Sequence, residues 1–230
     1  MTAEIQERFE EAGQYDAMMT RVFPGYEQLP LVVLSHLRTC LGQAARVLDV
    51  GCGTGATLTA FASHQPEWSF IGVDPAEPML EVARRKASAA DLNDRVAFIH
   101  GTVEALPDRP KFDAATCILV EHLLPDDGTK LHLLEEVHRR MVPGGWFVLV
   151  GLHGDLSKPS AQGKLEAWLE FVALQGLPKA AQDNVRHRAT VEDSVVPEKR
   201  IRGLLEEARF MNVKRIYQVQ LLGGWQAQKV

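Results

Sequence analysis

One short run constrains this chain more than any other: the apolar residues Val47, Leu48 and Val50, followed by three glycines within five residues. The glycines are Gly51, Gly53 and Gly55. The segment is typical of a strand buried on both faces, and residues 56–63 read as the start of a helix. Glycine allows positive φ and close backbone approach, and a helix N-terminus offers unpaired N–H groups. We therefore expect a ligand site at this turn.

Two acids flank the glycine turn. Asp49 lies just before it, where a carboxylate can accept hydrogen bonds from a cationic amine, and Asp74 ends the next apolar segment, 68–73. A carboxylate at the end of a parallel strand can hold the two hydroxyls of a ribose. Gly51, Gly53 and Ala56 also satisfy the dinucleotide fingerprint G-x-G-x-x-G/A. The glycines alone therefore leave a nicotinamide dinucleotide open as the ligand.

Size and composition limit the class of protein. At 230 residues with 46% hydrophobic and 24% charged residues, the chain fits one globular domain, 1–230. The net charge of −5 argues against a general nucleic-acid binder, and no apolar run approaches the roughly 20 residues of a membrane span. Three cysteines without a C-x-x-C pair and a polar, acidic start lead us to expect a reducing cytoplasmic location. His132 and His138 are six residues apart, so we expect no metal site.

Strands and helices alternate along most of the chain. Helices are expected over 2–12, 24–41, 56–63, 75–90, 128–141 and 197–210, and strands over 46–50, 68–74, 95–100, 112–120, 146–150, 213–219 and 221–229. This alternation predicts an α/β fold with a doubly wound, mostly parallel seven-stranded sheet and a terminal antiparallel hairpin. We expect residues 1–42 to form a helical lid. Residues 152–196, with helices near 161–175 and 179–189, should form a helical cap insertion.

Four landmarks, in order, resemble class I S-adenosylmethionine (SAM)-dependent methyltransferases over about residues 45–150. They are Val47–Gly55, Ile71–Asp74, Phe112–Asp113 and the Val142-Pro-Gly-Gly-Trp146 turn. The resemblance implies a Rossmann-like methyltransferase fold and transfer of a methyl group from SAM to an O, N or C nucleophile, with S-adenosylhomocysteine as product. A Rossmann dehydrogenase lacks the Pro-Gly-Gly turn and the terminal hairpin, so the nicotinamide interpretation is disfavoured.

The same resemblance implies a set of cofactor-binding residues. They are Asp49, Gly51, Cys52, Gly53, Gly55, Asp74, Pro75, Met79, Thr102, Val103, Glu104, Leu119 and Val120. Asp49 and the glycine loop would hold the methionine part, Asp74 the ribose, and Met79 the adenine. Many relatives carry an aspartate where this chain has Thr102, so the contact to the adenine amino group would be uncharged here, or Glu104 would replace it.

Candidate catalytic residues follow the fourth and fifth strands. Glu121, His122 and His153 lie where a base could deprotonate an acceptor, and a histidine titrates near neutral pH. In the lid, Tyr15 and Tyr26 are candidate substrate contacts.

A narrower resemblance, to the carboxy-SAM synthase of tRNA wobble-uridine modification, rests on Phe23–Tyr26, the cap helices and Glu198–Gly224. It implies that Arg186 contacts the extra carboxylate of that cofactor or the substrate, and Arg21 similarly contacts the cofactor carboxylate.

The sequence therefore predicts a SAM-dependent methyltransferase that acts on a small molecule, with no membrane span. Two alternatives stay open: a carboxy-SAM synthase-like enzyme of tRNA modification, and a non-catalytic SAM-binding module. General nucleic-acid binding is disfavoured, while tRNA as a partner and a homodimer both stay open.

Overall fold

The computed structural model describes residues 12–109 and 111–230, and the helix predicted over 2–12 lies outside them apart from its last residue. In the described part, a seven-stranded sheet has the order β3-β2-β1-β4-β5-β7-β6. The strands are β1 (Arg46–Val50), β2 (Ser69–Asp74), β3 (Val96–His100), β4 (Phe112–Ile118), β5 (Met141–Leu152), β6 (Phe210–Val219) and β7 (Leu222–Lys229). The first five are parallel, and β7 runs antiparallel to both β5 and β6. The predicted fold class is confirmed.

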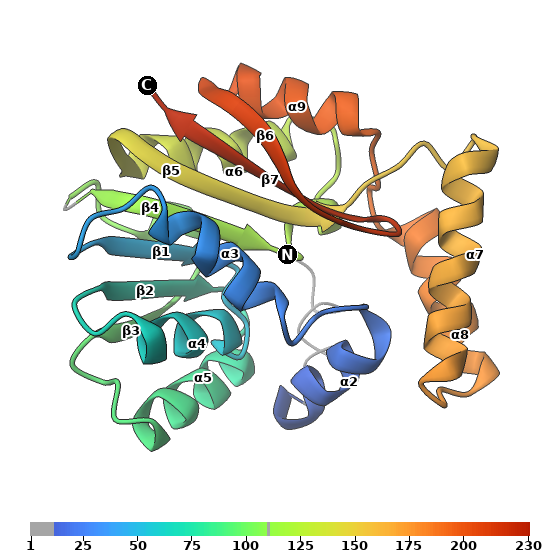
Figure 1. The fold of residues 1–230 in the computed structure, drawn as a ribbon, viewed down its shortest axis with the longest axis horizontal. Helices are drawn as coiled ribbons and strands as arrows, with labels where there is room; N and C mark the ends of the chain where they lie inside the picture. The colour runs from blue at the N-terminus through green and yellow to red at the C-terminus, as the bar shows by residue number, and fades with distance from the viewer. Residues whose placement is uncertain (1–11, 110) are drawn as a thin grey trace.

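Helices cover both faces of the sheet (Figure 1). One face carries α3 (Leu29–Arg38), α4 (Ala56–His64) and α5 (Glu77–Ala89), and the other carries α6 (Thr129–Arg140) and α9 (Glu198–Glu207). Successive residues of β1 alternate between the two cores: Val47 packs in the cluster of α3 and α4, and Leu48 in that of α6 and α9. Both are fully buried, which explains why the strand reads as a continuous apolar run.

The remaining helices lie beyond the carboxyl ends of the parallel strands (Figure 1). They are α2 (Tyr15–Val22) after the short turn η1 (Ala12–Gln14), then α7 (Pro159–Leu174), α8 (Lys179–His187) and the π-helical turn η4 (Arg188–Glu192). The Trp168 indole N–H donates to the Val22 carbonyl at 2.7 Å and its ring packs on Phe23, with centroids 5.3 Å apart. The N-terminal helix is thereby joined to the segment that follows β5, above the end of the sheet where ligands of open α/β folds bind.

Two local predictions are wrong. The helix predicted to begin near Pro24 begins at Leu29, because Gly25 takes a φ of +80° and the chain makes turns before α3. The Pro143-Gly-Gly145 segment is not a separate turn: β5 already begins at Met141, and its pairing with β4 shifts register between Phe112 and Ala114. No helix in the described residues is long and apolar enough to cross a membrane.

Candidate cofactor and substrate site

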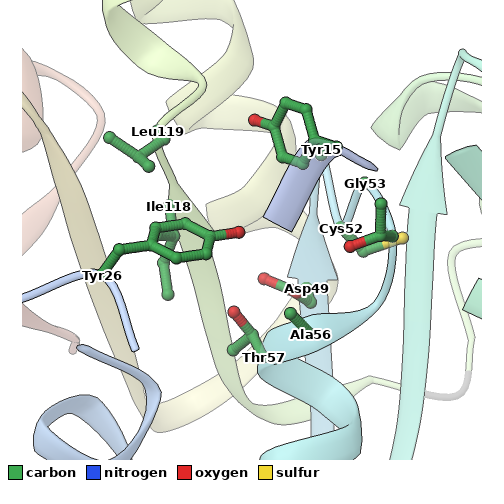
Figure 2. Close-up of a pocket in the computed structure, with 11 residues that line it drawn as sticks. Tyr15, Tyr26, Asp49, Cys52, Gly53, Ala56, Thr57, Ile118 and Leu119 are labelled. Carbon is green, nitrogen blue, oxygen red and sulfur yellow. The ribbon is translucent and has the colours of Figure 1, made fainter. Parts of the chain in front are cut away.

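A pocket of about 400 Å³, including the space at its mouth, opens over the carboxyl ends of β1 and β4 (Figure 2). Its lining residues are Tyr15, Tyr26, Asp49, Gly51, Cys52, Gly53, Thr54, Ala56, Thr57, Ile118 and Leu119. Seven of the eleven belong to β1, the glycine turn or the start of α4, and two come from the N-terminal lid. The turn predicted from sequence is therefore the floor of the pocket.

The glycine turn is fixed to the neighbouring strand by its own backbone. The N–H groups of Gly51 and Cys52 both donate to the carbonyl of Val73, at 2.8 and 3.1 Å. The φ angles are +68° at Gly51, +51° at Gly53 and +71° at Gly55. A Cβ at Gly51 would lie 2.3 Å from Cγ2 of Val120, so a side chain there meets both a clash and an unfavourable φ. Glycine is required, and the backbone stays open to a ligand.

Asp49 is a buried carboxyl at the floor of the pocket (Figure 2). The Thr116 hydroxyl donates to its Oδ1 at 2.6 Å. Burial raises the pKa of Asp49 from 3.8 to about 7, with a smaller contribution from the charge of Asp74 and an opposing one from the Thr116 hydrogen bond. A cationic ammonium group in the pocket would favour the ionised carboxylate and pair with it.

Asp74 joins the glycine turn to the start of α5. Its Oδ2 accepts the Gly53 N–H at 2.9 Å and its Oδ1 accepts the Ala76 N–H at 2.8 Å. The side chain is mostly buried, and burial raises its pKa despite these two backbone donors. Each carboxylate oxygen can accept a second hydrogen bond, so the group can hold ribose hydroxyls while keeping the turn in place.

Two of the predicted adenine-side residues, Met79 and Val103, are buried. Met79 is buried against Tyr15, and its Cε lies 3.3 Å from where a Cβ of Gly53 would be. The Gly101 N–H donates to the backbone carbonyl of Asp74 at 3.0 Å. The short helix η2 (Val103–Ala105) begins two residues after Gly101. Val103 is buried in the core.

The other predicted adenine-side groups sit nearer the surface. The half-exposed Glu104 lies 3.2 Å from the His132 ring. The Pro75 carbonyl is 3.0 Å from Nε2 of His100. The assignments of these residues to adenine remain predictions.

A strained residue forms the opposite wall. Leu119, directly after β4, has a φ of +61°, which costs a non-glycine residue about 1–3 kcal/mol. Its N–H donates to the Val150 carbonyl at 2.7 Å, which holds the turn in this conformation. With Ile118 it contributes apolar surface to the lining of the pocket (Figure 2). This wall is suited to the apolar part of a ligand.

Asp16 in α2 is a site residue that the sequence reasoning missed. Its Oδ1 accepts the Thr54 hydroxyl at 2.7 Å and the Tyr26 hydroxyl at 3.3 Å, and its carboxylate also pairs with Lys86 of α5. One side chain of the lid thereby contacts the glycine turn, the second lid tyrosine and α5. The sequence gives no signal for this beyond the position of Asp16 next to Tyr15.

The first two predicted catalytic residues lie just beyond the pocket wall, in η3 (Glu121–Leu123). Both are buried, and Glu121 pairs with buried Lys130 at 2.7 Å. The His122 Nδ1 accepts the Leu152 N–H at 3.4 Å. Burial, with the charges of Lys130 and Arg188, lowers the pKa of His122 to about 3. His122 is therefore neutral at physiological pH, and neither residue lines the pocket.

The third predicted catalytic residue, His153, contacts the antiparallel edge of the sheet. Its Nε2 is 2.8 Å from Oε1 of Gln218, and its ring packs edge-on against Trp225 with centroids 4.9 Å apart. Burial lowers its pKa. His153 does not line the pocket, so its catalytic role stays a prediction.

The two predicted arginines contact other parts of the chain. Arg21 donates from Nε and Nη2 to the Gln175 carbonyl, at 3.3 and 3.0 Å. Arg186 forms a two-pronged pair with Glu166, at 2.6 and 2.8 Å, near the surface of the cap. Neither lines the pocket. Their assignment to ligand carboxylates stays a prediction.

Comparison with known proteins agrees with this geometry. Residues 47–145 match the methyltransferase domain family. The ubiquinone biosynthesis O-methyltransferase of Alkalilimnicola ehrlichii is 33% identical over 75% of this chain and 70% of its own length. The carboxy-SAM synthase of Actinobacillus succinogenes is 26% identical over 74% of this chain and 80% of its own.

A solved structure shares the fold across the chain. The human N-acetylserotonin methyltransferase, solved with SAM, superposes with a TM-score of 0.64 at 17% identity, over all of this chain and 60% of that one. The fold and pocket define a nucleoside-binding α/β protein with an acid at each of two neighbouring strand ends. The chain belongs to the class I SAM-dependent methyltransferases, and SAM is its cofactor.

Proposed function

We propose that the chain methylates a small organic molecule at an oxygen, nitrogen or carbon nucleophile bound next to the cofactor pocket. The observation that carries the proposal is the pair of buried acids, Asp49 and Asp74, on either side of an obligatory glycine turn. A relative of 33% identity is an O-methyltransferase of ubiquinone biosynthesis, which favours oxygen as the acceptor atom.

The residues of the pocket fit SAM. Burial makes ionisation of Asp49 unfavourable and raises its pKa to about 7. The ammonium group of the methionine part of SAM would stabilise the ionised carboxylate and offset this effect. Gly51 keeps the backbone open where a Cβ would clash, and Asp74 has acceptor capacity for a ribose. When bound, SAM supplies an electrophilic methyl group.

The chain would contribute positioning. Holding a nucleophile in line with a methyl group can supply on the order of 7–11 kcal/mol of the barrier. Leu119, Ile118 and the two lid tyrosines line the pocket and would position the acceptor. The link from Asp16 to Thr54 holds the lid over the glycine turn and limits the entry of water.

The lid (1–42) and the cap (152–196) are proposed to enclose the acceptor within a single domain, 1–230. Their contact through Trp168 and Val22 supports a shared cover. An enclosed site favours a small molecule over a polymer, and three free cysteines fit a cytoplasmic location. The homodimer and the tRNA partner that the sequence leaves open are not part of the proposal.

A carboxy-SAM synthase-like activity is the second candidate, and the 26% identical synthase favours it. Its predicted discriminator, Arg186, is paired with Glu166 and does not line the pocket. We therefore rank it below methyl transfer.

The test is calorimetry followed by an acceptor panel. SAM and S-adenosylhomocysteine should bind the purified chain in the micromolar range, and NAD should not bind. Release of S-adenosylhomocysteine is then followed with phenol, catechol, carboxylate and amine acceptors. Binding of NAD without SAM would overturn the proposal. SAM binding with no turnover across the panel would favour the non-catalytic binding module.

A further inference from the structure

One carboxylate of the lid accepts the hydroxyl protons of two residues that line the pocket. Oδ1 of Asp16 accepts the Thr54 hydroxyl at 2.7 Å and the Tyr26 hydroxyl at 3.3 Å. Both donors are lining residues, one from the glycine turn and the other from the segment before α3. Because they bond the same oxygen, the two hydroxyls lie side by side, and Figure 2 shows the Tyr26 hydroxyl directed into the pocket.

The direction of these two hydrogen bonds follows from the groups that form them. A carboxylate has no proton to give, so the Thr54 and Tyr26 hydroxyls both donate to it. Each hydroxyl has a single proton, and its oxygen is left with lone pairs that can only accept. Lys86 pairs with the other carboxylate oxygen, Oδ2, which leaves Oδ1 to the two hydroxyls. Asp16 therefore fixes both oxygens as acceptors toward a ligand.

The side-chain charges of the pocket lining have one sign. Of the described residues that line the pocket, none has a cationic side chain, and Asp49 supplies a buried carboxyl at the floor. A third hydroxyl, that of Thr116, is oriented in the same way, because it donates to Asp49 at 2.6 Å. A carboxyl and oriented hydroxyl oxygens around one space favour positive charge in the ligand.

SAM has two positive centres, its ammonium group and its sulfonium, whereas S-adenosylhomocysteine keeps only the ammonium. Asp49 is assigned to the ammonium. We propose that Asp16 is a positioning residue that orients the Tyr26 and Thr54 hydroxyls to favour the charged sulfonium of SAM over the neutral thioether of S-adenosylhomocysteine. This inference rests on the proposed function and deepens it, because it names the residues that distinguish the methyl donor from the spent cofactor.

Orientation of the hydroxyls and closure of the lid are separable effects of Asp16. A lid held over the glycine turn stabilises SAM and S-adenosylhomocysteine alike, since both have the same nucleoside and amino acid groups. Oriented oxygens distinguish the two ligands, because only one of them is charged at sulfur. A pocket with such oxygens holds the spent cofactor less well than one with unoriented hydroxyls, relative to SAM, which favours its release after transfer.

The test uses calorimetry to measure the dissociation constants of SAM and S-adenosylhomocysteine, and its readout is the change in their ratio on substitution. Asp16→Ala removes the acceptor, and Tyr26→Phe removes one hydroxyl while keeping the ring. Each should weaken SAM binding at least ~5-fold more than S-adenosylhomocysteine binding. Glu81→Ala, which removes an exposed acid of α5, is the matched control and should leave the ratio unchanged.

Asp16→Asn provides a conservative variant and keeps the proposal testable if Asp16→Ala does not fold. Its amide oxygen can still accept the two hydroxyls, so it should retain more of the wild-type ratio than Asp16→Ala does. An unchanged ratio in Asp16→Ala, with both ligands weakened equally, would make Asp16 a lid contact only and overturn the inference. An unchanged ratio in Tyr26→Phe would overturn it as well.

These outcomes leave the proposed function standing, since they concern only the relative affinity of two ligands that both bind. Failure of the wild-type chain to bind either SAM or S-adenosylhomocysteine would instead refute the proposed function itself.

Discussion

Replacing Asp49 by asparagine should stabilise the fold and weaken cofactor binding at the same time. Burial raises the pKa of Asp49 from 3.8 to about 7, so the folded chain keeps a proton that the unfolded chain releases. The stabilising effect of that proton is fully present below pH 3.8 and is lost as the pH rises through 7. Asparagine is neutral at every pH, and its side-chain oxygen can still accept the Thr116 hydroxyl.

The expected magnitude follows from the pKa difference. From 3.8 to about 7, at 1.36 kcal/mol per pH unit, ionisation of Asp49 costs the folded state about 4 kcal/mol. The gain in unfolding free energy of Asp49→Asn over wild type should therefore be small at pH 4 and approach ~4 kcal/mol at pH 8. Loss of the buried charge partner should weaken SAM binding by about 2 kcal/mol or more, roughly 30-fold.

Urea unfolding at pH 4, 6 and 8 gives the free energies, and calorimetry gives the affinities. Asp94→Asn, at an exposed acid, is the matched control. If the difference in unfolding free energy between Asp49→Asn and wild type is the same at pH 4 and pH 8, the pKa of Asp49 is not raised by burial. If SAM binds the variant as well as it binds the wild type, Asp49 is not the ammonium partner.

Three further variants test the rest of the site. Asp74→Asn keeps only one acceptor oxygen for two backbone N–H groups and the ribose, so calorimetry should show SAM binding at least ~10-fold weaker; unchanged affinity would remove the ribose assignment. Gly51→Ala places a Cβ 2.3 Å from Val120 at a φ of +68° and should lose about 2–3 kcal/mol in urea unfolding. Gly163→Ala, with open space in α7, is its control and should gain up to ~1 kcal/mol. His122→Gln should leave the pH dependence of kcat between pH 5 and 8 unaltered, because the pKa of His122 is about 3; loss of an inflection in that range would make it the base.

The parts of the site that depend on residues adjacent in the sequence could be predicted from the sequence. The glycine turn needs positive φ at three positions, and the two acids lie at or near the carboxyl ends of buried strands, so the local pattern was enough to place Asp49 and Asp74. The five parallel strands and the terminal hairpin were also predicted from a local pattern, the alternation of apolar segments and helices along the chain.

The parts that depend on tertiary packing were not predictable. Asp16 reaches Thr54 across 38 positions, and the Trp168 indole reaches the Val22 carbonyl only after the cap has folded back over the sheet. The position of His122 after a strand suggested a base. The sequence could not show that the ring would be buried and would accept the Leu152 N–H.

The most direct test of the central claim is a crystal structure with S-adenosylhomocysteine. Its amino group should lie within hydrogen-bonding distance of Asp49 and its ribose hydroxyls within that of Asp74, with the sulfur facing the space between Leu119 and the lid. Density for the nucleoside elsewhere on the chain, or a pocket still filled by Tyr15 and Tyr26 at saturating ligand, would contradict the account.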